Sequence, residues 1–102
     1  MSLREKQARF CRMVSHLIAW AWEHGYELRF GDAYRDPRVN WTYGAPNSKH
    51  KTRLAVDLML DINGTWQRST EAYRPLGEYW ESIGGRWGGR WEDGNHFEYG
   101  GQ

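Results

Sequence analysis

The stretch SKHKTRLAVDLMLDING, residues 48–64, places one carboxylate inside an apolar run and thereby constrains the fold around it. Apolar side chains alternate along this run, which predicts a β-strand with one buried face. The buried positions are Leu54, Val56, Leu58 and Leu60. Asp57 falls on the other face beside the small Ala55, and a carboxylate is costly to bury there without a partner. The strand therefore predicts either a solvated face or a bound cation next to Asp57.

Segments before this strand predict an α+β fold in which a small antiparallel sheet has flanking helices. Apolar residues at helical spacing predict an amphipathic helix over residues 3–24, which Gly25 ends. Residues 26–32 alternate well enough to predict a strand. Residues 33–49 then form a long loop, and long loops in compact domains tend to be functional.

The second half of the chain predicts a hairpin, a helix and a closing strand. Asn-Gly at 63–64 is a strong hairpin signal, so residues 65–68 should return beside the preceding strand. A helix is expected over residues 70–83, with Thr70 as its N-cap and Pro75 near its first turn. A glycine-rich loop and a short strand are expected at residues 84–95 and 96–100.

Composition predicts one domain over residues 1–102. The formal net charge is +1 and the 14 Lys and Arg residues are scattered, which argues against a nucleic-acid partner. No apolar run approaches the ~20 residues of a membrane span, and the charged N-terminus does not resemble a signal peptide. We therefore expect a monomer that is made in the cytoplasm and does not insert into membranes. Cys11 is expected to be half-buried on the first helix.

Four residues carry the chemistry of a metal site. His50 lies seven residues before Asp57 and can fold back toward it from the loop that precedes the strand. His96 belongs to the closing strand, and two imidazoles with one carboxylate form a three-ligand zinc site with an open fourth position. Asp93, three residues before His96, is a further carboxylate that is available as a base for water.

Each of these residues also has an ordinary structural interpretation. His50 alone is typical of a solvated loop histidine, and Asp57 of a surface carboxylate paired with Lys51 or Arg53. His96 alone is typical of a strand residue between aromatic neighbours. Spacing by itself leaves both interpretations open, because His and Asp are common residues.

The segment SKHKTRLAVDL resembles the S-x-H-x-x-x-x-A-x-D motif of a family of zinc peptidases. That family includes D-Ala-D-Ala carboxypeptidases and dipeptidases and phage L-alanyl-D-glutamate endopeptidases. Its zinc-site fold is shared with lysostaphin-type enzymes and the Sonic hedgehog signalling domain. WEDGNHFEY resembles the family's [DE]-x-x-H segment, and AYR resembles its upstream Tyr-Arg. The three segments occur in the family's order over residues 33–99.

The resemblance assigns a role to each residue that matches the motifs. It implies that a Zn²⁺ ion is bound by His50, Asp57 and His96. It also implies that Asp93 is the catalytic base and that Arg35 holds the substrate or stabilises the developing oxyanion.

Neighbouring positions suggest supporting residues. Ser48 matches the motif's serine and is expected to support the site by hydrogen bonding. Glu98 shares a strand face with His96 and is placed to orient its imidazole, and Trp91 is expected to line the substrate groove. Arg53 stands where many members have glycine, which predicts a different local turn.

The resemblance implies a zinc metallopeptidase in a single catalytic domain that cleaves the stem peptides of peptidoglycan. The expected activity is that of an L-alanyl-D-glutamate endopeptidase. It would serve as a phage or prophage endolysin, made in the host cytoplasm and acting on periplasmic peptidoglycan after release. Two alternatives stay open: a D-Ala-D-Ala carboxypeptidase or dipeptidase, and a non-catalytic zinc-containing module that binds the cell wall.

Overall fold

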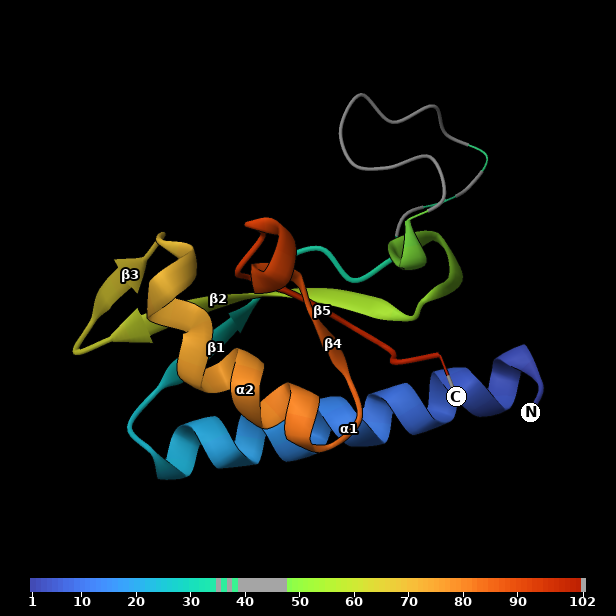
Figure 1. The fold of residues 1–102 in the computed structure, drawn as a ribbon, viewed down its shortest axis with the longest axis horizontal. Helices are drawn as coiled ribbons and strands as arrows, with labels where there is room; N and C mark the ends of the chain where they lie inside the picture. Colours follow the sequence, from blue (N-terminus) through green and yellow to red (C-terminus); the bar gives the residue numbers. More distant parts are fainter. Residues whose placement is uncertain (35, 37, 39–47, 102) are drawn as a thin grey trace.

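The computed structural model describes residues 1–34, 36, 38 and 48–101. Its elements are α1 (Leu3–Glu23), β1 (Glu27–Phe30), the 3₁₀ turn η1 (Lys49–Thr52), β2 (Ala55–Ile62), β3 (Thr65–Gln67), the 3₁₀ turn η2 (Thr70–Tyr73), α2 (Arg74–Ser82), β4 (Arg86–Trp87), the 3₁₀ turn η3 (Gly88–Trp91) and β5 (His96–Glu98). Two helices flank a small antiparallel sheet (Figure 1), so the predicted α+β fold is confirmed.

β2 is the central strand, since β1, β3 and β5 all pair with it. The strand order is β1-β2-β5-β4 with β3 as the returning arm of a hairpin, and every pair is antiparallel. Asp57 lies opposite His96 in the β2–β5 pair. On the other edge, the Asp57 N–H donates to Asp32 O (2.7 Å) and its carbonyl accepts from the Gly31 N–H (2.8 Å). The chain is therefore held on both sides at Asp57.

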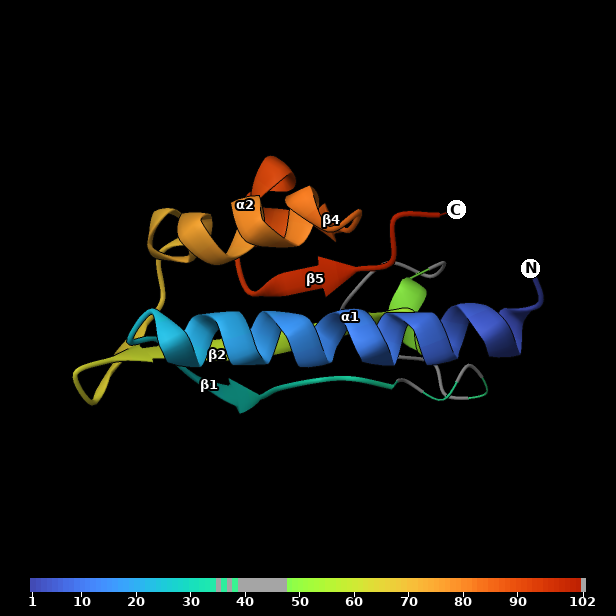
Figure 2. The same cartoon turned by 90° about the horizontal axis from the view of Figure 1, so that it is seen from below.

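The core lies on the apolar face of β2, which leaves the Asp57 face to other side chains. Trp80 of α2 is fully buried, with its ring 5.8 Å from Phe10 of α1 and 6.0 Å from Phe97 of β5, centroid to centroid. Figure 1 shows α1 along one side of β2 and η1 and η3 on the other, and Figure 2 shows α1 running along the strand. The predicted buried positions Leu54, Val56, Leu58 and Leu60 all belong to this core.

α1 is amphipathic, as predicted, and begins at a capping box in which Ser2 and Glu5 each accept the other's backbone N–H. Its buried residues are Phe10, Met13, Leu17 and Ala21. Cys11 is exposed, so the expected half-buried position is wrong: one helical step of roughly 100° turns it off the buried stripe. Across the part of the chain that the structure describes, no helix is long and apolar enough to cross a membrane.

The predicted hairpin is confirmed. Asn63 and Gly64 have positive φ values of 51° and 78°, as a type I′ turn requires, and β3 returns beside β2. The Asn63-Gly64 turn thus fixes the register between β2 and β3.

β1 is shorter than the predicted strand over residues 26–32.

The predicted helix over residues 70–83 is divided into η2 and α2. Ser69, and not Thr70, is the N-cap: its hydroxyl accepts from the Ala72 N–H (3.2 Å). Pro75 lies in the first turn of α2, as predicted, because it has no N–H to bond to the preceding turn.

Residues 84–95 are not all loop, contrary to the prediction; half of them belong to β4 and η3. Their neighbour Gly77 on α2 lies against the fully buried ring of Trp87, so closely that an added Cβ would be 2.0 Å from the ring. The Trp87 indole N–H donates to Gly94 O (2.7 Å). Small residues in this region make room for a tryptophan and do not mark a flexible segment.

We expect Gly77→Ala to lower the free energy of unfolding by about 1–2 kcal/mol. The 2.0 Å approach of the methyl group to the Trp87 ring places the overlap penalty near the upper end of about 1–3 kcal/mol, and the better helix propensity of alanine offsets about 1 kcal/mol of it. Urea unfolding measures the change, and Glu78→Ala at an exposed position of α2 is the control. Equal stability of Gly77→Ala and the unmodified protein would contradict the packing described.

Candidate metal centre

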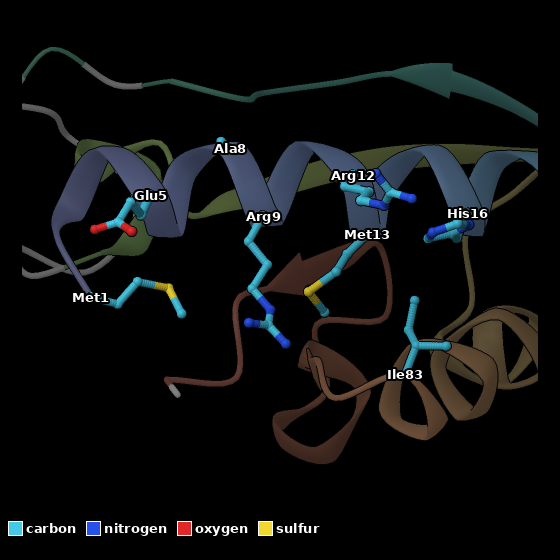
Figure 3. A pocket seen from close by; sticks show the side chains of 8 residues that line it. All are labelled: Met1, Glu5, Ala8, Arg9, Arg12, Met13, His16 and Ile83. Atoms are coloured by element: carbon cyan, nitrogen blue, oxygen red, sulfur yellow. The ribbon is translucent and has the colours of Figure 1, made fainter.

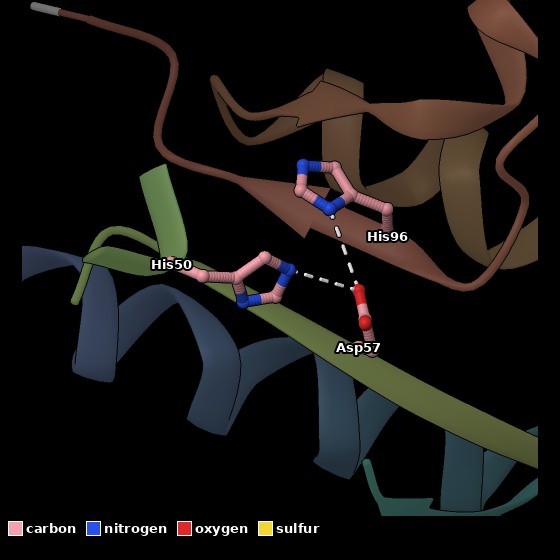
Figure 4. A group of neighbouring side chains, drawn as sticks. All are labelled: His50, Asp57 and His96. Atoms are coloured by element: carbon pink, nitrogen blue, oxygen red, sulfur yellow. Dashed lines mark ion pairs between the residues drawn. The ribbon is translucent and has the colours of Figure 1, made fainter. Parts of the chain in front are cut away.

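Asp57 is the meeting point of the candidate site. In the β2–β5 pair it lies directly opposite His96, and its Oδ1 is 3.4 Å from His96 Nδ1. The same Oδ1 is 3.2 Å from Nε2 of His50 (Figure 4). One carboxylate oxygen therefore faces two imidazole nitrogens that come from different parts of the chain.

His50 reaches Asp57 from η1, the short turn that precedes β2, as the sequence predicts. Ser48 caps this turn, and its hydroxyl accepts from the His50 N–H (3.2 Å), the kind of support expected of it. The His50 ring is buried, and its Nδ1 donates to Ala33 O (3.4 Å). With that proton on Nδ1, the lone pair of Nε2 points at the site.

His96 is oriented in a similar way by Glu98. Its Nε2 donates to Glu98 Oε1 at 2.7 Å, which leaves the Nδ1 lone pair facing Asp57. Glu98 is itself buried, and its second oxygen lies 3.8 Å from Lys49 Nζ and 3.4 Å from Arg86 Nη1. The sequence analysis did not identify Lys49 or Arg86 as partners of Glu98. The pairing of β4 with β5, which places Arg86 opposite Glu98, accounts for one of these contacts.

The donor atoms fit a zinc ion. His50 Nε2 and Asp57 Oδ1 are both buried without a hydrogen-bond partner although they are 3.2 Å apart, since two lone pairs face each other. One ligand atom from each of His50, Asp57 and His96 can be chosen so that all lie within 4.8 Å of one another. Zinc prefers imidazole nitrogen and carboxylate oxygen at about 2.0–2.2 Å in a tetrahedron, whose corners are then about 3.4 Å apart.

The charges of the site favour cation binding. Burial raises the pKa of Asp57, but hydrogen bonds and positive charge from the imidazoles of His50 and His96, when these are protonated on the side of Asp57, outweigh burial and hold the pKa at about 2. Burial lowers the pKa of His96, while Asp57 and Glu98 raise it more, so the net shift is upward. Asp57 is thus ionised at neutral pH, and a cation beside it relieves the cost of its partial burial.

Asp93 lies at the exposed edge of the cluster. Its carboxylate is half exposed, and Oδ2 is 3.9 Å from His96 Nδ1. The backbone of Asp93 is fixed, because its N–H donates to Gly88 O (2.9 Å) and its carbonyl accepts from the His96 N–H (3.1 Å). A carboxylate held near the ligands but open to solvent is suited to moving a proton.

Two predicted site residues remain, Trp91 and Arg35, and the structure describes only the first. Trp91 is 45% exposed, and its ring centroid is 5.7 Å from that of His96, beside the cluster where a groove residue would lie. Arg35, the predicted substrate or oxyanion residue, lies outside the described residues.

Arg53 does not produce the different turn that the sequence predicts. It adopts the left-handed conformation that glycine favours, with φ 60° and ψ 33°, at the end of η1. Its guanidinium carbon lies 4.1 Å from the centroid of the Tyr34 ring. This cation–π contact links the turn that carries His50 to the segment before Arg35.

A hollow of about 680 Å³ lies away from the cluster, along α1, and reaches Ile83 at the end of α2 (Figure 3). Arg9, Arg12 and Met13 are among its lining residues. None of the cluster residues lines it, so size alone does not identify the site of chemistry.

Comparison with known proteins agrees with the geometry. The sequence model of a protein family described as D-alanyl-D-alanine carboxypeptidase matches residues 42–99, more than half of the chain. The matched segment contains His50, Asp57 and His96 as well as Asp93. No curated protein sequence matches the chain at a significant level.

We expect zinc to stabilise the folded protein, because the three ligands converge only in the native state. At 100 times the dissociation constant the gain is about 2.7 kcal/mol, which raises the Tm of a chain of this size by roughly 10 °C or more. Calorimetry with zinc and with chelator measures the shift. Asp57→Asn should reduce it strongly, whereas His16→Ala on the exposed part of α1 should leave it unchanged. A Tm that does not respond to either addition would exclude a zinc site here.

Substitutions at Arg53 should separate backbone strain from ring contact. The left-handed conformation costs a non-glycine residue roughly 1–2 kcal/mol, and an exposed cation–π contact returns about 0.5–1 kcal/mol. Arg53→Ala keeps the strain and loses the contact, so we expect it to be less stable than both the native protein and Arg53→Gly in urea unfolding. If Arg53→Gly is the least stable of the three, the backbone is not strained at this residue.

Proposed function

Because this chain belongs to the D-alanyl-D-alanine carboxypeptidase family of zinc metallopeptidases, we propose that it hydrolyses a peptide bond in the stem peptides of peptidoglycan. The bond proposed is the L-alanyl-D-glutamate bond, cut by a monomer in a single catalytic domain that acts as a phage or prophage endolysin. Such an enzyme is made in the host cytoplasm and reaches periplasmic peptidoglycan after release. A role with nucleic acid or within a membrane is not proposed, in keeping with the net charge of +1.

The observation that carries the proposal is the buried His-Asp-His cluster with the exposed carboxylate of Asp93 at its edge. A non-catalytic zinc-containing module that only bound the cell wall would have no need of a base within 3.9 Å of a ligand nitrogen. The position of Asp93 therefore supports a catalytic role over the non-catalytic alternative.

Each residue of the site has a defined task in hydrolysis. His50, Asp57 and His96 would hold a zinc ion, which would supply Lewis acidity toward a carbonyl and a water molecule. The Asp93 carboxylate takes the proton of the attacking water at its exposed oxygen and gives it to the leaving amine. Glu98 keeps the His96 ring in one tautomer and orientation. Arg35, by its place in the sequence motif, supplies positive charge for the substrate or the developing oxyanion.

A second candidate is the removal of a terminal D-alanine, as a carboxypeptidase or dipeptidase. The description of the matching family favours it. This reaction needs a pocket that closes around a free carboxylate, whereas cleavage within the stem needs a groove that is open at both ends.

The test is digestion of purified Gram-negative peptidoglycan with and without chelator, followed by mass analysis of the fragments. New L-alanine and D-glutamate termini that vanish with chelator and return with zinc support the proposal. Release of free D-alanine would replace it with the second candidate. Intact sacculi under every metal condition would contradict both.

We expect Asp93→Asn to lower kcat by about 10²–10⁴-fold while zinc binding is kept, because the general base is lost and the three ligands are not. Zinc content is measured on the same preparation by elemental analysis. Glu78→Gln at an exposed position of α2 is the control and should retain activity. Full activity of Asp93→Asn would remove Asp93 from the mechanism.

A further inference from the structure

A hollow of about 280 Å³ lies beside the metal centre on the Asp57 face of the sheet. Met59 follows Asp57 by two residues on β2, so it shares that face, and it lines the hollow. Asp93 lines it as well and lies 3.9 Å from His96. The hollow therefore begins next to the reacting centre and extends along β2 to Trp66 and Arg68 at the hairpin.

The walls of the hollow are held in place by buried contacts. The Tyr73 hydroxyl donates to Gln67 O (2.7 Å) and accepts from the Leu60 N–H (3.0 Å), which fixes the wall formed by β3. On the opposite wall, Gly94 lies so close to Thr70 that an added Cβ would be 2.7 Å from the Thr70 Cα. The hollow is thus a formed feature of the fold.

Arg68 brings a positive charge to the hairpin end of the hollow. Its guanidinium carbon lies 4.1 Å from the centroid of the Trp66 ring, which holds the planar group against a flat surface. Within the described part of the chain, no carboxylate pairs with Arg68. Arg29 approaches the same ring at 6.0 Å, but Asp61 neutralises it through an ion pair of 2.7 Å.

Charge within the hollow is divided between its two ends. Glu92 and Asp93 line the end next to the metal centre, and Arg68 lines the other. A negatively charged group is repelled from the acidic end and attracted to the guanidinium, so an anionic ligand has one favoured orientation. Thr70 and Asn95 add hydroxyl and amide donors between these ends.

We propose that this hollow is a substrate subsite that binds a peptide carboxylate, with Arg68 as its ion-pair partner. The inference rests on the proposed function and specifies the part of the substrate that is recognised next to the scissile bond. Stem peptides offer two sources of such a group: the α-carboxylate of γ-linked D-glutamate and the C-terminal carboxylate. Arg68 determines specificity in this arrangement and has no part in the bond-breaking step.

The experiment compares three synthetic stem peptides with the zinc-loaded protein: one with all carboxylates free, one with a carboxamide at the D-glutamate α-position, and one with a C-terminal carboxamide. We expect one of the two amides to lower kcat/KM by about tenfold or more, mainly through KM, since a charge-assisted contact is lost. Arg68→Gln should abolish that discrimination. Arg29→Gln, which alters the same Trp66 surroundings from outside the hollow, should retain it.

The outcome separates this inference from the proposed function. Cleavage with the same discrimination in Arg68→Gln, or with no discrimination in the native protein, overturns the subsite and leaves the peptidase proposal standing. If no peptide is cleaved, calorimetric titration of the same three peptides decides: binding of the free-carboxylate peptide that is weakened about tenfold by Arg68→Gln supports the subsite alone. Absence of binding overturns it. The amide that has the effect identifies which carboxylate is bound.

Discussion

The structure depends on the antiparallel register that places Asp57 of β2 opposite His96 of β5. A shift of one residue would turn Asp57 into the core and remove both side chains from each other's reach. The register is fixed on both sides of β2, by β5 on one edge and by the backbone bonds of Asp57 to Gly31 and Asp32 on the other. The metal centre is therefore as well defined as the sheet itself, and only His50 has to be added from outside the sheet.

The imidazole of His96 shows how buried charge is managed around this centre. It lies between two carboxylates, Asp57 on the metal side and Glu98 on the other. Glu98 is in turn approached by Lys49 and Arg86, whose charges are closer to solvent. Carboxylates and nitrogen groups thus alternate from Asp57 through His96 and Glu98 to Lys49 and Arg86 near the surface.

Local sequence pattern predicts the strand faces of the site, whereas the choice of His50, Asp57 and His96 as ligands needed the motif resemblance as well. The period-two alternation around Asp57 gives its face, and the same rule places Glu98 beside His96. The structure of residues 84–95 could not be predicted, since several of its glycines are required by close contacts that only the folded chain creates, such as Gly85 against the Trp80 ring and Gly94 against Thr70. The cap at Ser69 was missed because serine and threonine are both good N-caps and stand side by side at residues 69–70. The left-handed Arg53 was missed because residues other than glycine rarely adopt that conformation.

The close packing around Asp93 has a consequence for the way this carboxylate is positioned. Gly88 has no space for a side chain, since a Cβ would lie 2.3 Å from Asp93 O, and Gly94 is equally confined against Thr70. The turn that carries Asp93 is therefore packed too closely to move far without losing these contacts. Among the described residues, this carboxylate is held beside His96 by the fold itself and is not brought there by a moving segment. The position of Asp93 is thus set when the chain folds, so no binding energy has to be used to bring it into place.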